Sequence, residues 1–243
     1  MANFGFPNLA VAAPYEEHWQ EARSAVGAEA LLQNARCTQS MAEAVAEDTL
    51  VIGTGTLAHR KPEQKVVALP AISPIVEREI ARGGRVAIVF GSEKRGLTRD
   101  DLAHCHLLVE IPTDARQPSM NLGQAVAVCL YELAASHRGQ TANHDEPAAR
   151  AAGDSGDSDA AAAPARSDEL PPSAGDLELL AGLVEETMQA ANYAPATMRA
   201  ANRRDLQLLL CKLTLTRRDA RRIMGLFRRV LWRLGHLSDR IEK

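Results

Sequence analysis

The 243-residue sequence has no run of about 20 apolar residues, and its N-terminus lacks the basic and then apolar pattern of a secretion signal. The cysteines are scattered, with no Cys-x-x-Cys pair and no histidine set at zinc-ligand spacing, at Cys37, Cys105, Cys129 and Cys211. Residues 104–106 read His-Cys-His, but alternate residues of an extended segment point opposite ways and cannot easily share one metal. These absences predict a soluble, cytoplasmic protein with reduced, mostly packed thiols, no metal and no membrane span.

Length and composition suggest one or two domains, since nearly half of the residues are apolar and can bury a full core. The net charge of −3 argues nothing for nucleic-acid binding by itself. Its distribution matters more, because the C-terminal end of the chain is strongly basic.

Strands and helices are expected to alternate over residues 1–136. Apolar runs predict strands at 8–12, 49–53, 85–90 and 107–111. Helical spacing predicts helices at 15–30, 72–81 and 121–136, while residues 37–47 predict a helix or a short strand that leads into one. Short connections between such elements indicate a parallel sheet covered on both faces, which is an α/β fold.

Residues 137–173 are rich in Ala, Asp, Gly, Ser and Pro and predict a flexible linker, or partial helix in their Ala-rich part. A small all-α domain is expected at 174–243. Its helices cover 177–188 and 206–213, and a third begins at Thr216, with Asp219 placed for a capping box. This third helix has one apolar stripe, and elsewhere it carries Arg217, Arg218, Arg221, Arg222, Arg228, Arg229 and Arg233.

Two loops that follow predicted strands could carry chemistry. Gly91 would allow a ligand to approach the backbone, and Gly96 would allow the return turn, which leaves Glu93 and Arg95 exposed; an ordinary charged loop is the alternative. The second loop ends in Ser-Met-Asn at 119–121, where the serine or the asparagine could simply cap the next helix. Loops at neighbouring strand ends are where open α/β sheets bind ligands.

Residues 53–56, Gly-Thr-Gly-Thr, form a weaker motif, since a flexible turn reads the same way. The loop directly follows an apolar strand. His59, Arg60 and Lys61 come next and could contact phosphate, or form a solvated charge run.

Segments 91–97 (GSEKRGL) and 111–122 (IPTDARQPSMNL) resemble motifs 2 and 3 of the SpoU/TrmH family of SPOUT methyltransferases. Members methylate ribose 2′-hydroxyls in RNA with S-adenosylmethionine. The resemblance runs from Met1 to about Ala135, and it is greatest to members that modify the tRNA anticodon loop and carry a helical C-terminal extension. It implies a trefoil-knotted α/β fold and a homodimer with active sites at the subunit interface.

The resemblance also implies residue roles. Catalysis would involve Glu93, Ser119 and Asn121, which place the cofactor and the ribose. S-adenosylmethionine would be held by Thr54, Gly55, Thr56, Gly91, Ile111, Pro118, Ser119 and Met120. RNA contact is expected from Arg60, Arg95, Arg217, Arg221 and Arg228, because Arg-rich helical faces bind phosphate.

One family motif is expected to be missing. Motif 1 is an Asn, a Gly and an Arg on an N-terminal strand-loop-helix unit that ends in a phrase like R-A-M-x-N-F-G. This chain begins M-A-N-F-G, as though it entered that phrase near its end. Either the start codon is misassigned and the protein is longer by about thirty residues, or the member is degenerate. The intact downstream motifs favour misassignment, and the chain as given should be a poor catalyst.

The main hypothesis is a tRNA 2′-O-methyltransferase. The alternatives are a catalytically degenerate RNA-binding protein and an enzyme that acts on rRNA instead of tRNA. A nucleotide-binding Rossmann enzyme would require a G-x-G-x-x-G after the first strand, and the sequence has none there.

Overall fold

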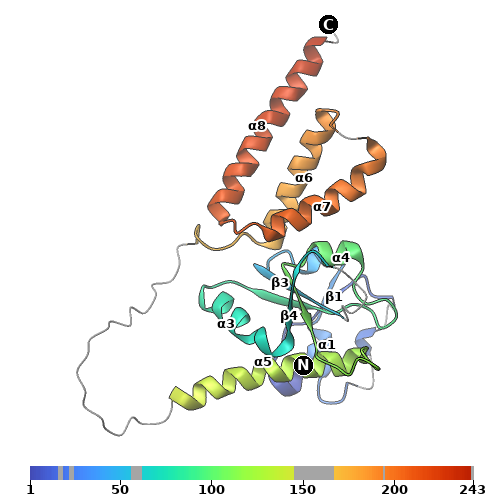
Figure 1. The fold of residues 1–243 in the computed structure, drawn as a ribbon, viewed down its shortest axis with the longest axis vertical. Coiled ribbons are helices and arrows are strands. Elements are labelled where there is room, and N and C mark those ends of the chain that lie inside the picture. The colour runs from blue at the N-terminus through green and yellow to red at the C-terminus, as the bar shows by residue number, and fades with distance from the viewer. Residues whose placement is uncertain (16–18, 22–24, 56–61, 145–166, 194, 242–243) are drawn as a thin grey trace, which may run out of the picture.

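A computed structural model describes residues 1–15, 19–21, 25–55, 62–144, 167–193 and 195–241. These residues form an α/β unit and a bundle of three helices that stands on one edge of it (Figure 1). The main sheet has four parallel strands in the order β4-β6-β3-β5. Their bounds are Leu50–Thr54 for β3, Lys65–Ala68 for β4, Val86–Val89 for β5 and Leu107–Glu110 for β6. The predicted α/β class with a parallel sheet is confirmed.

The two N-terminal strands, β1 (Ala10–Ala12) and β2 (Arg36–Thr38), pair with each other in a separate two-stranded parallel sheet. The described strands therefore form two parallel sheets, where the sequence pattern predicts a parallel sheet without separating the N-terminal pair. The short helices α1 (Glu29–Gln33) and α2 (Met41–Ala44) flank β2 in the sequence. Strand β2 followed by α2 is the second of the two alternatives predicted for residues 37–47.

The main sheet is apolar on both faces, because successive residues of each strand point to opposite sides. On β3, Ile52 faces one core and Val51 the other, and on β6 Val109 and Leu108 divide in the same way. The first core is closed by α3 (Ser73–Ala81), the 3₁₀ turn η3 (Leu69–Ala71) and α5 (Leu122–His144). The second core is closed by residues from α2, α4 (Arg99–Ala103) and the start of the bundle.

Three boundaries differ from the sequence prediction. The helix expected at 15–30 does not form as one element: Trp19–Glu21 is a 3₁₀ turn, and Gly27 has a φ of +76°, so α1 begins only at Glu29. Strand β4 was missed, because in its four residues only Val67 is buried. Helix α5 continues to His144, although the linker was expected to begin at 137.

The C-terminal bundle consists of α6 (Ala174–Ala190), α7 (Arg199–Lys212) and α8 (Arg217–Ile241), and α7 begins seven residues earlier than predicted. Its buried core is apolar and contains Leu177, Leu180, Ala181, Leu210 and Met224. The predicted capping box at the start of α8 is confirmed. The Asp219 carboxylate accepts from the Thr216 amide at 3.2 Å, and the Asp219 amide donates to the Thr216 hydroxyl oxygen at 3.2 Å. The remaining short turns are η1 (Ala2–Phe4), η2 (Trp19–Glu21) and η4 (Ala196–Met198).

The bundle is joined to the sheet edge at which the parallel strands begin. The first two amides of α6 donate to carbonyls just before β3: Ala174 to Asp48 at 2.8 Å and Gly175 to Ala46 at 2.9 Å. A Cβ on Gly175 would lie 2.8 Å from the Ala46 oxygen, so this close approach requires glycine. None of the described helices is long and apolar enough to cross a membrane. The trefoil knot stays a prediction.

Candidate active site

The three predicted loops leave the same edge of the sheet. Strands β5, β3 and β6 are neighbours and run parallel, so their carboxyl ends lie together. The ends are also tied by hydrogen bonds: the Thr54 hydroxyl donates to the Val89 carbonyl at 2.9 Å, and the Gly55 amide donates to the Val109 carbonyl at 3.4 Å. This edge is opposite the one that carries the helical bundle.

The loop after β5, residues 91–97, is a closed turn that depends on its two glycines. A Cβ on Gly91 would lie 2.0 Å from the carbonyl carbon of Gly96 and 2.2 Å from the amide nitrogen of Leu97. Gly96 has a φ of +64° and donates from its amide to the Ser92 carbonyl at 2.7 Å. The turn leaves Glu93 exposed, and Glu93 has no partner among the described residues.

Leu97 anchors this turn to the sheet. Its side chain is buried and lies 3.2 Å from the place where a Cβ on Gly53 would be. That Cβ would also lie 2.8 Å from the Cys105 sulfur, so Gly53 is required by packing. Gly55 is different, because a side chain there would meet nothing within 4 Å. Within residues 53–56, Gly55 is the described position that leaves open space for a ligand.

The loop after β6 is held by its own polar groups. The Thr113 hydroxyl donates to the Pro118 carbonyl at 3.2 Å. Asp114 accepts from the Arg116 guanidinium at 2.8 and 3.0 Å and from its amide, and these bonds lower the pKa of the Asp114 carboxyl. Both side chains are largely exposed, so the pair shapes the loop more than it stabilises the fold.

Asn121 begins helix α5, as the simpler interpretation predicts. Its side-chain oxygen accepts from the Gly123 amide at 2.9 Å, which leaves the NH₂ group available. Ser119 does not share this capping role: it is exposed and has no hydrogen bond among the described residues. Pro118 and Met120 on either side of it are half-buried, and Ile111 packs against the first core.

The edge therefore combines backbone groups in tight turns, small residues, an exposed carboxylate and an exposed hydroxyl. Such an arrangement suits a ligand that is held largely by peptide groups. Most of the predicted site residues lie in these three loops or at the strand ends beside them. They are Thr54, Gly55, Gly91, Glu93, Arg95, Ile111 and residues 118–121. Thr56 and Arg60 lie outside the described residues.

The His-Cys-His segment serves the fold. The His106 ring nitrogen Nδ1 accepts from the Val51 amide at 3.1 Å, and burial lowers the pKa of His106 to about 4. Burial raises the pKa of the Cys105 thiol far above its usual range, and that of Cys211 to about 12. These thiols stay protonated and are not nucleophiles. In the described parts of the chain, no group of three His, Cys, Asp or Glu side chains is placed to hold a metal.

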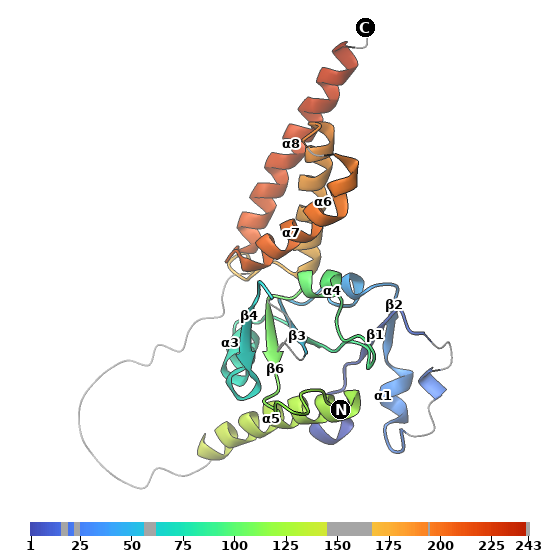
Figure 2. The same ribbon diagram turned by 45° about the vertical axis from the view of Figure 1, so that its right-hand side comes forward.

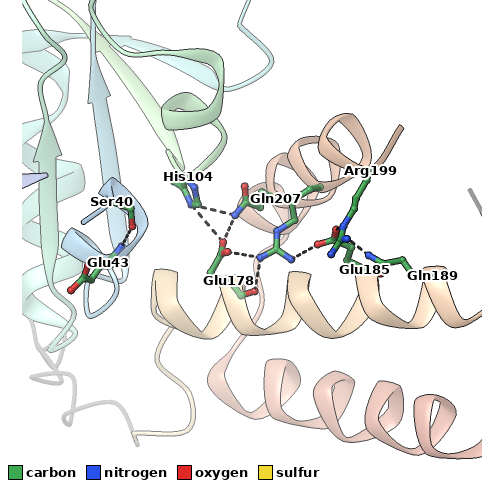
Figure 3. A network of polar contacts seen from close by, with 9 residues as sticks. Ser40, Glu43, His104, Glu178, Glu185, Gln189, Arg199 and Gln207 are labelled. Atoms are coloured by element: carbon green, nitrogen blue, oxygen red, sulfur yellow. Dashed lines mark hydrogen bonds and ion pairs between the residues drawn. The ribbon is translucent and has the colours of Figure 1, made fainter. Parts of the chain in front are cut away.

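His104 belongs instead to a polar network between α4 and the bundle (Figure 3). Its Nδ1 lies 3.4 Å from the Gln207 amide and 3.9 Å from the Glu178 carboxylate. Arg203 bonds both to Glu178 and, at 3.0 Å, to Glu185. Burial lowers the pKa of His104, so the ring acts mainly as a neutral contact. The network holds the bundle against the sheet.

A cavity of about 260 Å³ between α6 and α7 lies within this bundle. Its charged lining residues include Arg199 and Glu185, which pair with each other at 2.6 Å. The cavity is therefore largely neutralised from within, and it lies away from the three loops.

The predicted RNA-contacting arginines of α8 fall into two groups. Arg221 pairs with Asp168 at 2.7 Å, and half-buried Arg217 bonds through its amide to the Leu170 carbonyl. Both hold the segment that precedes α6. Arg228 is exposed and has no ion pair with a described residue, and Arg229 and Arg233, which were not selected from the sequence, share that state.

Comparison with known proteins places these features in one family. The sequence model of the SpoU rRNA methylase family matches residues 1–131. An uncharacterized tRNA/rRNA methyltransferase of Haemophilus influenzae is 36% identical over 133 residues, which is 55% of this chain and 54% of that protein. The tRNA (cytidine-2′-O-)-methyltransferase TrmJ of Methanocaldococcus jannaschii is 36% identical over 136 residues, 55% of this chain and 58% of that protein. The chain thus spans little more than half the length of these relatives.

A solved structure extends the likeness in fold. The crystal structure of TrmJ from Z. mobilis superposes with a TM-score of 0.73 at 24% identity, covering 95% of this chain and 89% of that one. At this identity the likeness concerns the fold alone. It reaches beyond residue 131, so the helical bundle is part of the shared architecture.

Proposed function

This chain belongs to the SpoU rRNA methylase family, and we propose that it transfers a methyl group from S-adenosylmethionine to a ribose 2′-hydroxyl in tRNA. The observation that carries the proposal is the loop edge of the sheet, above all the closed turn at Gly91 and Gly96 beside the loop that ends at Ser119. The similarity to TrmJ of Methanocaldococcus jannaschii, named as a tRNA 2′-O-methyltransferase, supports tRNA as the substrate.

The residues present fit a nucleoside cofactor. The turn at Gly91 has no room for a side chain, Gly55 faces open space, and backbone groups at 111–120 follow the neighbouring strand. S-adenosylmethionine would be held by Thr54, Gly55, Thr56, Gly91, Ile111 and residues 118–120, and it would supply an activated methyl group. Thr54 would contribute through its backbone, because its hydroxyl already bonds to Val89.

The side chains at this edge would orient the ribose. The Ser119 hydroxyl has no hydrogen bond with a described residue, and the NH₂ group of Asn121 can donate while its oxygen caps α5. Glu93 is an exposed carboxylate that can accept a hydrogen bond from a sugar hydroxyl or take its proton. Orientation supplies much of such a rate, and a general base adds a further ~10²–10⁴-fold. We assign Asn121 to positioning and Glu93 and Ser119 to the reacting hydroxyl.

The two units would divide the work. Residues 1–136 would carry the cofactor chemistry, and the helices at 174–243 would hold RNA, as the exposed arginines of α8 that pair with no described residue suggest. The expected homodimer, with sites shared between subunits, belongs to the same proposal.

The test is transfer of a labelled methyl group from S-adenosylmethionine to bulk tRNA, with rRNA in parallel, followed by digestion to nucleosides. We expect label in 2′-O-methylated nucleosides from tRNA. RNA binding without methyl transfer would replace the proposal with a non-catalytic RNA-binding role.

A further inference from the structure

Helix α8 is strongly basic over most of its length. From 220 to 238 the sequence has five arginines and no Asp or Glu, although the whole chain carries a net charge of −3. Arg228, Arg229 and Arg233 are exposed, and none of them forms an ion pair with a described residue. We call these three arginines and Trp232 the distal patch. Its charge is available to an anionic partner.

Trp232 lies on the arginine face, away from the bundle core. The core side of α8 is marked by Ala220, Met224 and Phe227. At about 100° per residue, Trp232 projects about 120° around the helix from Ala220, between Arg228 and Arg229. Its side chain is 62% exposed, so packing within the chain does not account for a tryptophan at this position.

The ring contacts one other aromatic side chain among the described residues. The rings of Trp232 and His236 lie 4.1 Å apart between centroids and are tilted by 38°, and the His236 ring nitrogen lies 2.9 Å from the Trp232 carbonyl oxygen. This pair holds the indole against the helix and leaves much of the ring exposed. A flat, exposed π-surface flanked by cations is what an unpaired nucleotide base requires.

We propose that Trp232 stacks on an unpaired base of RNA while Arg228, Arg229 and Arg233 contact the flanking phosphates. The proposal rests on the proposed action of the chain on RNA and adds a second recognition site to it. The patch lies on the free half of α8, on the far side of the bundle from the loop edge (Figure 2). Within one chain, the stacked base is therefore a different nucleotide from the one that is methylated.

Charge and packing argue against a membrane surface or a second copy of the chain as the partner of the distal patch. A basic helix that lies on a membrane inserts its apolar face, but the bundle core occupies that face in the first half of α8. A second copy that pairs along the distal patch would bring arginines against arginines. RNA satisfies both the cations and the aromatic ring.

The first experiment uses Trp232 as its own reporter. The chain has two tryptophans, so Trp19→Phe in the full chain leaves Trp232 as the only one. We titrate this variant with a single-stranded oligouridylate, a duplex RNA of equal length, inorganic polyphosphate and vesicles of anionic phospholipid. Only the single strand should quench the indole fluorescence saturably, because only it offers unpaired bases. Equal quenching by polyphosphate, or a blue shift with vesicles but not with RNA, would overturn the proposal.

The second experiment measures tRNA affinity by anisotropy. Trp232→Ala should bind about five- to one-hundred-fold more weakly, as expected for the loss of one stacked base, and Trp232→Phe should restore most of the affinity. Leu226→Ala, an equally exposed apolar position on the same helix, is the matched control and should change nothing. Unchanged binding by Trp232→Ala, or no rescue by phenylalanine, would contradict stacking.

A charge variant and the methylation assay separate the remaining roles. R228Q together with R229Q should lower the salt dependence of binding by about 1.4 in log–log slope, and an unchanged slope would remove these arginines from the interface. If quenching persists while the chain does not methylate RNA, the stacking site stands and the enzymatic proposal fails. If the chain methylates RNA but RNA does not quench Trp232, the enzymatic proposal stands and the stacking proposal fails.

Discussion

Acidification should destabilise this protein through one half-buried histidine. His106 precedes β6, and its Nδ1 accepts from the Val51 amide while its own amide donates to the Val51 carbonyl at 2.9 Å. The ring thereby extends the pairing between β3 and β6 by one residue. This geometry requires a neutral imidazole, and burial lowers the pKa of His106 to about 4, against about 6.5 in an unfolded chain.

The sign and size of the effect follow from this pKa. Below about pH 6.5 the unfolded chain binds a proton that the folded chain refuses until about pH 4. Stability is therefore complete above pH 6.5 and falls as the pH is lowered. The loss approaches about 1.4 kcal/mol per pH unit, which gives about 2 kcal/mol at pH 5 and about 3 kcal/mol at pH 4.

Urea unfolding of the natural chain and of His106→Asn at pH 7.5, 6, 5 and 4.5 isolates the contribution of His106 to the free energy of unfolding. The asparagine oxygen can accept the Val51 amide in place of Nδ1 but does not titrate. Carboxylates also reduce the stability of both proteins in acid when they become protonated. Glu185 is one of them, because its bond to Arg199 lowers its pKa. Their contribution is the same in both proteins and cancels in the difference between the two unfolding free energies. The variant should gain about 2 kcal/mol relative to the natural chain between pH 7.5 and 5. If the unfolding free energies of the two proteins changed with pH in parallel, the reasoning would be refuted.

Three further substitutions test the two edges of the sheet. Gly91→Ala should weaken S-adenosylmethionine binding at least about ten-fold in calorimetry, because its Cβ would displace the backbone of the turn; Gly225→Ala, in open space on α8, should leave binding unchanged. Arg203→Met should lower the unfolding free energy by about 2 kcal/mol in urea, since it leaves two half-buried carboxylates with fewer partners; a loss below about 0.5 kcal/mol would mean that the network is solvated. Gly175→Val should speed hydrogen exchange at the start of α6 without altering cofactor affinity, because its side chain would meet the Ala46 carbonyl; unchanged exchange would show that the contact gives way freely.

Local sequence patterns predicted the strands that carry apolar residues on both faces. β3, β5 and β6 are continuous apolar runs that end near a glycine or a proline, so their pattern is independent of the rest of the fold. β4 gave no such signal, because it buries only Val67 and leaves Lys65, Val66 and Ala68 exposed. Its pairing with β6 depends on tertiary structure that a four-residue window does not contain.

The candidate site was predictable in its residues but not in how they are used. A glycine pair after a strand indicated the turn at 91–97, yet the contact that requires Gly91 is with the backbone of Gly96, five residues later. Thr54 and Asn121 were expected to face a ligand, but one side chain bonds to a neighbouring strand and the other caps a helix. Trp232 was not selected from the sequence, because a single aromatic residue outside the apolar stripe of a helix carries no signal until its exposure is known.

The position of the bundle gives the two edges of the sheet different roles. The loops lie at the carboxyl ends of the strands and α6 is bonded at the amino ends, so the two are separated by about the length of β3, or roughly 16 Å. Helix α8 then extends for 25 residues, about 37 Å, away from the sheet. An RNA that touches both the loops and the distal patch of one chain must span both lengths. A short single strand can reach only one of them, so it can quench Trp232 or enter the loops but not do both at once. Occupancy of the patch is therefore independent of the chemistry for short RNAs and becomes coupled to it only in a folded RNA of sufficient length.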